Sequence, residues 1–217
     1  TDDSTCCGAS LPIPFGTQIG QDIDAEAAGD WSGYSVSTSA DGNTVAIGAP
    51  YNDLNGYDAG HVRIYSYNGS SWIQIVQDID AEAIGDENGW SVSLSSDGSI
   101  VAIGAKQNDG NGTDAGRVRI YNYNGSSWVQ LGQDIDGEAG ENYSGWSVSL
   151  SSDGGTVAIG APWNGNGSNS GHVRIYNWDG SSWIRLGNDI DGEALGDQSG
   201  YSVSLSSDGD TVAIGAC

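Results

Sequence analysis

The chain has 217 residues, and its 29 acidic side chains against 6 lysines and arginines give a formal charge of −23. Such a surface repels the phosphates of nucleic acids and anionic membranes, and no apolar run approaches the roughly 20 residues of a membrane span. The 35 glycines, 8 tryptophans and 10 tyrosines, beside one phenylalanine and no methionine, favour short strands and tight turns over helices. We therefore expect an all-β protein with no nucleic-acid partner and no membrane insertion.

One stretch of sequence occurs four times and organises the chain. Its copies begin at Asp22, Asp78, Asp134 and Asp189, at intervals of 55 or 56 residues. Near-identity at a fixed period of this size is typical of a repeat architecture. We treat residues 1–217 as a single domain, in which residues 1–21 precede the first repeat.

Four strands are predicted in each repeat, and the third copy shows them most clearly. The first, 146–151, alternates apolar and hydroxyl residues, and a tight Ser-Asp-Gly turn leads to the second, 156–160, which is almost continuously apolar. A Gly/Asn loop precedes the third strand, 172–177, and a two-residue hairpin signal precedes the fourth, 182–186. A longer acidic loop then returns to the next repeat. Four antiparallel strands per repeat are typical of a β-propeller blade, whereas solenoid coils are usually shorter.

The repeated residues resemble the FG-GAP repeat, the blade of integrin-α-type propellers. S-G-Y-S-V and its variants occur at 32–36, 88–92, 144–148 and 199–203, and each is followed by G-A-P, G-A-K or G-A-C. The G-H-V-R-I-Y strand also matches the family, and the D-I-D-G-E-A stretch is closest to the tandem variety of secreted and surface proteins. The resemblance covers residues 16–217.

Two departures from the family pattern limit what the resemblance implies. The phenylalanine of the Phe-Gly pair is replaced by Ser32, Asn88, Ser144 and Ser199. The family's calcium loop lies between the first two strands, where this chain has only a tight turn. The resemblance therefore implies no calcium at that place.

The strand count predicts how the ring is completed. First and second strands occur four times, but third strands with V-R-I-Y occur at 62–65, 118–121 and 173–176 only. By register, residues 16–21 match a fourth strand and residues 6–9 a third strand. We expect a four-bladed propeller whose ring the N-terminal strands close, since closure leaves no open sheet edge. The alternative is an open array completed by a second chain.

A repeated acidic motif, D-x-D-x-E, is the first candidate for binding. In an extended segment its acids project to one side, and like charges that close are unfavourable without a cation, so the motif predicts Ca²⁺ bound by hard oxygen ligands. The alternative is a solvated loop in which Asp and Gly serve turn chemistry. The candidate ligands are Asp22, Asp24, Glu26, Asp30, Asp78, Asp80, Glu82, Asp86, Asp134, Asp136, Glu138, Asp189, Asp191, Glu193 and Asp197.

The loops at 52–58 and 108–114, between the second and third strands, are the second candidate. In an up-and-down blade they lie at the same end as the acidic motif, so we expect one face of the ring to carry both. His61 and His172 share one repeat position, which Arg117 fills in the middle copy, and this pattern indicates a structural role rather than catalysis. The tryptophans also follow the repeat and are expected in the core: Trp72, Trp90, Trp128, Trp146 and Trp183.

Sequons and cysteines suggest the oxidising exterior of a cell. Five N-x-S/T sequons fall in predicted turns or loops, as glycan acceptors or as ordinary turn residues: Asn68, Asn111, Asn124, Asn142 and Asn166. By register Cys217 ends a second strand, where Cys6 and Cys7 would begin the third strand of the same blade. We expect Cys217 to pair with Cys6 or Cys7, which leaves one cysteine free to link another chain. The alternative is a head-to-tail bond between subunits.

These features together indicate a non-enzymatic module of the cell exterior. The absence of an initiating methionine favours a processed chain, and a removed secretory signal is the simplest cause. Only Trp163, Lys106 and the cysteines are clear singletons, and they form no catalytic set in the sequence. We expect a structural or adhesive propeller that binds itself, as a multimer or surface filament, or another surface protein. The alternative is a secreted carbohydrate-binding protein or an enzyme that uses the propeller face.

Overall fold

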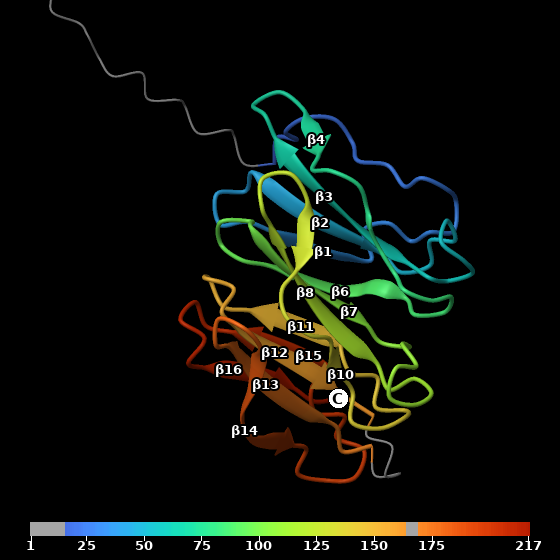
Figure 1. Cartoon of the computed structure of the whole chain (residues 1–217), viewed down its shortest axis with the longest axis vertical. Coiled ribbons are helices and arrows are strands. Elements are labelled where there is room, and N and C mark those ends of the chain that lie inside the picture. The colour runs from blue at the N-terminus through green and yellow to red at the C-terminus, as the bar shows by residue number, and fades with distance from the viewer. Residues whose placement is uncertain (1–15, 164–168) are drawn as a thin grey trace, which may run out of the picture.

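The computed structural model describes residues 16–163 and 169–217, and all regular elements in those ranges are β-strands (Figure 1). The expected all-β class is confirmed. No helix that could span a membrane occurs in those ranges. The strands form antiparallel sheets that follow the repeats in order along the chain.

The first two repeats form five-stranded sheets. In the first, β1 to β4 pair in sequence and β5 also pairs with β3: β1 (Ser35–Thr38), β2 (Thr44–Ala49), β3 (His61–Tyr67), β4 (Trp72–Gln74) and β5 (Ile79–Asp80). The second repeats this arrangement: β6 (Asn88–Leu94), β7 (Ile100–Ala105), β8 (Arg117–Tyr123), β9 (Trp128–Gln130) and β10 (Ile135–Asp136). Each of these sheets is one blade of the repeat.

The third and fourth repeats differ in their outer strands. The third is a four-stranded sheet: β11 (Ser147–Leu150), β12 (Thr156–Ala161), β13 (His172–Trp178) and β14 (Trp183–Asp191). The fourth has only two strands in the described ranges, β15 (Ser202–Leu205) and β16 (Val212–Gly215). The outer edge of β16 therefore lacks the third strand that β2, β7 and β12 each possess.

The acidic motif begins on a strand, so the fourth strand does not end at Leu186 as predicted and the acidic loop starts later. β14 runs past Leu186 to Asp191, which lies opposite His172 in the register with β13. In the first blade the same pairing places Asp80 opposite His61 and buries Ile79. A bulge interrupts the fourth strand before the motif, and this irregularity hides the continuation from the alternation pattern.

The turn between the first two strands of each blade uses its own aspartate. In the first blade the Ser39 hydroxyl donates to Asp41 Oδ1 at 2.6 Å, and the backbone N–H of Asn43 donates to the same oxygen at 2.9 Å. These bonds, that of Ser39 above all, lower the pKa of Asp41 to about 2. The carboxylate is thus occupied by the turn, as expected for a segment too short to be a calcium loop.

The hydroxyl faces of the first strands β1, β6 and β11 contact the next blade. The backbone N–H of Leu94 donates to Ser37 Oγ at 2.9 Å, and Ser35 Oγ donates to the carbonyl of Gly89 at 2.7 Å. A Cβ at Gly48 would overlap that same carbonyl oxygen, so the second-strand glycine permits the close approach of the blades. The same bonds recur between the second and third blades.

The apolar core lies between successive sheets. Val62 and Ile64 of β3 pack with Val101 and Ile103 of β7 in one cluster between the first and second blades. Val118 and Ile120 of β8 pack with Val157 of β12 in the next cluster. Burial of such side chains contributes roughly 1.5–3 kcal/mol each, which makes the sheet-to-sheet interfaces the main stabilising feature.

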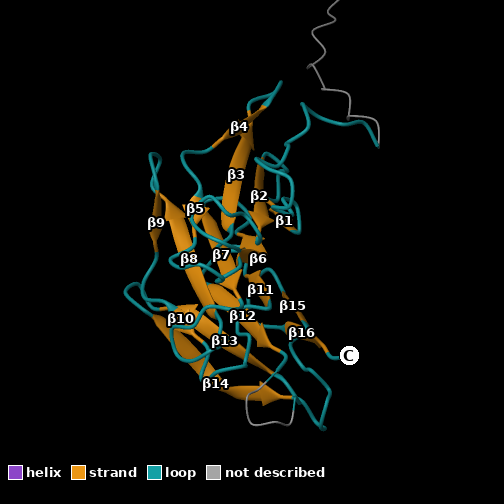
Figure 2. Ribbon diagram, turned by 90° about the vertical axis from the view of Figure 1, so that its right-hand side faces the viewer, coloured by secondary structure: helices purple, strands orange, loops and turns teal. Residues whose placement is uncertain are grey.

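The blades follow one another along an arc (Figures 1 and 2). The first strands β1, β6, β11 and β15 contact one another in that order. Residues 16–21 form no strand but lie against the first blade, where Gln21 and the backbone of Trp72 exchange two hydrogen bonds at 3.0 and 3.2 Å. Closure of the ring by the N-terminal strands is not seen in the described residues and stays a prediction.

Candidate functional site

A row of four aromatic side chains crosses the blades where the first strands begin. The ring centroids are 4.5 Å apart for Tyr34 and Trp90, 4.9 Å for Trp90 and Trp146, and 5.4 Å for Trp146 and Tyr201. Burial raises the pKa of Tyr34, and the nearby phenol of Tyr201 raises it further. The row thus joins the first strands of all four blades in the described residues.

Four further aromatic rings extend this row at its ends. Trp31, which is 57% exposed, packs edge-on against Tyr51 at 4.7 Å and lies 5.9 Å from Tyr34. At the other side Trp163 lies 4.4 Å from Trp146 and 5.5 Å from Tyr143. We call this group the aromatic centre: Tyr34, Trp90, Trp146 and Tyr201, with Trp31, Tyr51, Tyr143 and Trp163.

A buried ion pair lies beneath the aromatic centre. Lys106 Nζ is 2.6 Å from Glu87 Oε2, and only 5% of Lys106 and 4% of Glu87 are exposed. The ammonium also lies 3.8 Å from the centroid of the Trp90 ring, a favourable cation–π distance. Burial raises the pKa of Glu87, and the hydrogen bond from Lys106 opposes that rise.

Two residues that the sequence left as unrelated singletons meet here. Trp163 and Lys106 both contact Trp146, at 4.4 Å between ring centroids and 5.5 Å from the ammonium. They come from different repeats, and each follows a second strand, β7 for Lys106 and β12 for Trp163. Trp90 and Trp146, expected in the core, are half-buried in this row instead, whereas Trp183 is a core residue as expected.

The acidic motifs lie in separate clusters at the junctions between blades. In the second blade Arg117, the first residue of β8, is paired with acids from both flanking motifs. Its Nη1 lies 3.0 Å from Asp134 Oδ2, its Nε lies 2.7 Å from Asp136 Oδ1, and Nη1 also pairs with Glu82. The arginine therefore neutralises the carboxylates that the repeat brings together.

The third blade neutralises its acids with two other arginines. Arg174 pairs with Glu138, and its Nε lies 3.0 Å from Asp189 Oδ1. Arg185 lies 2.9 Å from Asp189 and 3.5 Å from Glu138. His172, at the position of Arg117, is buried, and burial lowers its pKa although Asp189 and Asp191 oppose the effect.

The first blade has a histidine where the second has its arginine. His61 Nδ1 lies 3.7 Å from Glu26 Oε2 and 3.7 Å from Asp78 Oδ2, and the side chain is 1% exposed. Neither ring nitrogen has a hydrogen-bond partner. Burial lowers the pKa of His61 while Asp78 and Glu26 oppose that effect, and the neutral imidazole is the form the site favours.

Other acids of the motif serve the loop itself. Asp30, Asp86 and Asp197 accept hydrogen bonds from backbone N–H groups three residues earlier in the chain, at 3.0, 3.1 and 2.7 Å. Oδ1 of Asp78 accepts a bond from Gln74 at 2.6 Å, and Oδ1 of Asp134 accepts one from Gln130 at the same distance. The predicted calcium ligands thus divide into turn-forming acids, arginine-paired acids and a remainder that includes Glu26, Asp78, Asp191 and Glu193.

The loops at 52–58 and 108–114 lie at the same end of the sheets as the acidic motif. Asn55 Nδ2 donates to the carbonyl of Ala81 at 2.9 Å, and the N–H of Gly85 donates to the carbonyl of Tyr57 at 2.9 Å. Asn111 makes the equivalent bond to Gly137 at 2.8 Å. The expectation that one face carries both loops is confirmed.

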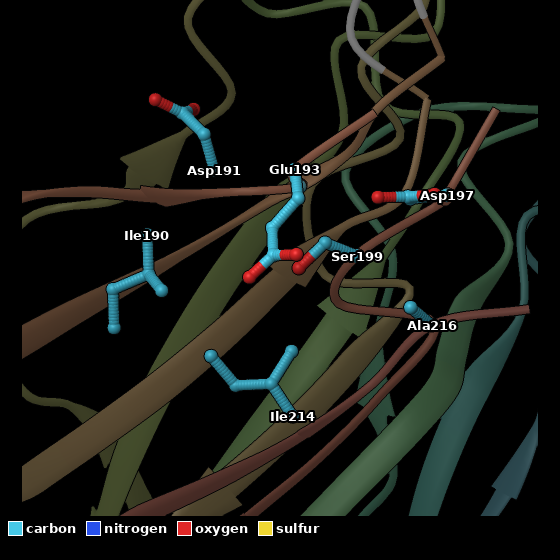
Figure 3. Close-up of a pocket in the computed structure, with 8 residues that line it drawn as sticks. Ile190, Asp191, Glu193, Asp197, Ser199, Ile214 and Ala216 are labelled. Carbon is cyan, nitrogen blue, oxygen red and sulfur yellow. The ribbon is translucent and has the colours of Figure 1, made fainter. Parts of the chain in front are cut away.

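A recess of about 380 Å³ opens beside the last acidic motif (Figure 3). Glu193 points between Ile190 and Ser199, with Ile214 of β16 beneath it. The lining residues are Ile190, Asp191, Gly192, Glu193, Asp197, Ser199, Ile214 and Ala216. The recess thus lies between β14 of the third blade and β16 of the fourth.

The sequons and the cysteines differ in accessibility. Asn68 and Asn124 are exposed in hairpin turns, whereas Asn142 is 4% exposed and the amide of Asn111 is hydrogen-bonded. Cys217 is exposed and forms no disulfide within the described ranges. Asn166, Cys6 and Cys7 lie outside the described residues, so the predicted disulfide and a glycan at Asn166 stay predictions.

Comparison with known proteins agrees with this architecture. The FG-GAP repeat family matches residues 24–65 and 134–176. The arrangement of repeated antiparallel sheets defines a β-propeller-type protein. More particularly, these two stretches match the FG-GAP repeat, as the sequence motifs indicated. No curated protein matches the sequence significantly.

Solved structures share the fold at low sequence identity. A Bacteroides uniformis protein assigned as a 6-phosphogluconolactonase superposes with a TM-score of 0.54 and 10% identity, over 83% of this chain and 46% of that chain. Hydrazine synthase of Kuenenia stuttgartiensis gives a TM-score of 0.51 and 14% identity, over 92% of this chain and 44% of that chain. The chain thus spans less than half the length of these neighbours, and the likeness shows the fold alone.

Proposed function

We propose that the chain is a non-enzymatic adhesive module of the cell exterior, which associates with further copies of itself through the aromatic centre. The observation that carries the proposal is the aromatic centre itself, because Trp31, Tyr34 and Tyr201 are 57, 44 and 42% exposed in one group. Exposed aromatic rings gathered at one place are typical of protein interaction surfaces. The FG-GAP repeats, which occur in extracellular and surface proteins, support the location.

The chemistry of the aromatic centre favours binding over catalysis. Its polar groups, Lys106 and Glu87, neutralise each other and are shielded beneath Trp90. Within the described residues, neither forms a hydrogen bond with a serine, threonine or cysteine side chain. An enzyme would need such a pair of groups at a position a substrate can reach.

Sedimentation velocity over a concentration series tests the proposal. At about 0.15 M salt, where charges are screened beyond about 8 Å, the protein should associate further as its concentration rises. Replacing Trp31→Ser should weaken this association, because Trp31 is the most exposed ring of the aromatic centre. A matched control is Leu195→Ser, which removes a 77% exposed apolar side chain from an acidic loop and should associate like the wild type.

Identical sedimentation of the wild type and Trp31→Ser would contradict self-association through this surface. A second candidate, carbohydrate binding, rests on the accessible face of Trp31, on which a sugar ring can stack. In that case cellohexaose should quench tryptophan fluorescence in the wild type and not in Trp31→Ser. This outcome would mean that the aromatic centre binds a carbohydrate and not a second copy of the chain.

We propose that calcium binds at the recess beside the last acidic motif, through Asp191 and Glu193. No arginine pairs with these two carboxylates among the described residues, and carboxylate oxygens are the ligands that Ca²⁺ prefers. Millimolar-scale calcium should raise the melting temperature by mass action, and Glu193→Gln should reduce the rise. An unchanged melting curve between calcium and excess chelator would leave the acids as a solvated loop.

A further inference from the structure

The three junctions that contain a third strand provide an internal comparison. Residues 56 positions apart correspond in the first two repeats, so Glu26, His61 and Asp78 correspond to Glu82, Arg117 and Asp134. In the second blade the guanidinium of Arg117 lies between the two carboxylates. In the third blade Arg174 and Arg185 supply the positive charge in a different way.

The first blade has the same acids but no corresponding cation. No lysine or arginine within the described ranges forms an ion pair with Glu26 or Asp78. Arg63, the nearest counterpart of Arg174, instead donates to the carbonyl of Asp24 at 2.7 Å and to Ser32 Oγ at 3.3 Å. Two carboxylates therefore converge on an imidazole where the other junctions have a guanidinium.

His61 is the independent sign that a ligand belongs at this place. Its side chain is 1% exposed, and both ring nitrogens lack a hydrogen-bond partner. A buried polar group without a partner costs about 1–3 kcal/mol, so natural proteins rarely leave one unsatisfied. The Nδ1 atom faces Glu26 and Asp78 at equal distances of 3.7 Å.

We propose that Glu26, His61 and Asp78 bind a divalent transition-metal ion of the zinc class, at the place that corresponds to the guanidinium of Arg117. The ligand atoms of the three residues lie within 4.8 Å of one another. Zinc bonds nitrogen and carboxylate oxygen at about 2.0–2.2 Å, so two ligands of one tetrahedral ion lie roughly 3.4 Å apart, close to the observed 3.7 Å.

The donor set distinguishes this ion from calcium. Imidazole nitrogen with two carboxylates suits zinc, whereas Ca²⁺ takes six to eight oxygen ligands. Gln74 holds Oδ1 of Asp78 and leaves Oδ2 facing His61, which orients the carboxylate as a partner of a ligating residue commonly does. The exposed side of Glu26 leaves room for a water molecule as the fourth ligand.

The test is calorimetric titration of the whole chain with zinc chloride at neutral pH, repeated with calcium chloride. The variants are His61→Arg, which copies the second blade, and His61→Gln, which keeps a polar side chain of similar size. Both should weaken zinc binding at this site by more than about 100-fold, since even losing a residue that only orients a metal ligand costs 10–100-fold. His172→Gln is the matched control and should bind zinc like the wild type, because arginines already neutralise its junction.

Cobalt in place of zinc excludes the cysteines as the source of binding. The cobalt-loaded protein should lack the near-ultraviolet charge-transfer band of a thiolate ligand and should lose its visible bands in His61→Arg. Near-ultraviolet circular dichroism should show that His61→Arg and His61→Gln are folded. Zinc affinity that is absent in the wild type, unchanged in both folded His61 variants, or lost equally in His172→Gln would overturn the proposal.

Discussion

At one repeat position, valine replaces glycine where the first and second blades meet. Position 76 precedes the motif glutamine and has valine, where positions 20 and 132 have glycine. All three residues adopt a positive φ, which is 58° for Val76, 71° for Gly20 and 78° for Gly132. A β-branched residue is strained in this left-handed region, at a cost of roughly 1–2 kcal/mol.

The strain at Val76 accompanies a lost hydrogen bond on the neighbouring blade. Trp183 Nε1 donates to the carbonyl of Leu131 at 2.7 Å, and Trp72 Nε1 donates to that of Ile19 at 3.0 Å. Trp128, at the same repeat position, has a buried Nε1 with no partner. A Cβ at Gly20 would lie 2.9 Å from Trp72 Cδ1, so a side chain at this position crowds the indole.

We predict that Val76→Gly stabilises the protein. The substitution relieves the left-handed strain and lets the indole N–H of Trp128 donate to the carbonyl of Ile75. Glycine has greater conformational freedom in the unfolded chain, which reduces the stabilisation by about 0.5–1 kcal/mol. The net increase in the free energy of unfolding should be about 1–2 kcal/mol, measured by denaturant titration. A decrease would show that Val76 contributes more by packing than it costs by strain.

The neighbouring glutamines provide the control for this prediction. Gln133 and the backbone of Trp183 exchange bonds at 2.9 and 3.2 Å, whereas no such bond joins Gln77 to Trp128. Gln133→Ala should therefore cost about 1–2 kcal/mol and Gln77→Ala should be close to neutral. In the Val76→Gly background Gln77→Ala should become destabilising, because the bonds to Trp128 can then form.

At the scale of the strands, most of the fold follows from local patterns. The alternation at 146–151 and the apolar run at 156–160 predict β11 and β12 to within one or two residues. The continuation of β14 to Asp191 could not be predicted from alternation, because a bulge with Gly187 at a φ of 68° resets the register before the motif. The acidic side chains also favoured a loop in the sequence analysis, whereas Asp80 and Asp136 are strand residues that pair with the start of a third strand.

The candidate sites depend on contacts that no single repeat contains. Lys106 and Trp163 are about one repeat apart, and both lie against the ring of Trp146. The repeat position of His61 indicated a structural role, and the sequence alone could not reveal that its ring nitrogens lack partners. By contrast, the shared face of the two loop sets follows from strand order, so topology was enough to predict it.

At the scale of the whole molecule, the N-terminal segment occupies a place that the repeat otherwise gives to a fourth strand. Gln21 binds the backbone of Trp72 as Gln133 of the second repeat binds that of Trp183. Residues 16–21 thus lie in the position of a fourth strand. That strand would belong to the blade that comes before the first blade in the ring. In a closed four-bladed ring that blade is the fourth, whose strand β16 pairs only with β15 among the residues that the structure describes.

We predict that the N-terminal residues complete the fourth blade and that Cys217 is linked to Cys6 or Cys7 within one chain. Cys217 lies two residues beyond the end of β16 and is exposed, so its sulfur is accessible to such a partner. Closing a loop of nearly the whole chain would stabilise the fold by roughly 4–5 kcal/mol on the chain-entropy model, less any strain. Non-reducing peptide mapping of dilute monomer should find the Cys217 peptide joined to the peptide that contains residues 6 and 7.

Amide hydrogen exchange then shows whether the ring is closed or only cross-linked. The amides of β16 that do not bond to β15 should exchange as slowly as those of β12, which is paired on both sides. Protection that grows with protein concentration, together with Cys217 cross-links found only in covalent multimers, would instead mean that a second chain supplies the missing strands. Rapid exchange of these amides at every concentration would contradict closure in either form, because an exposed edge strand leaves its outer N–H groups open to water.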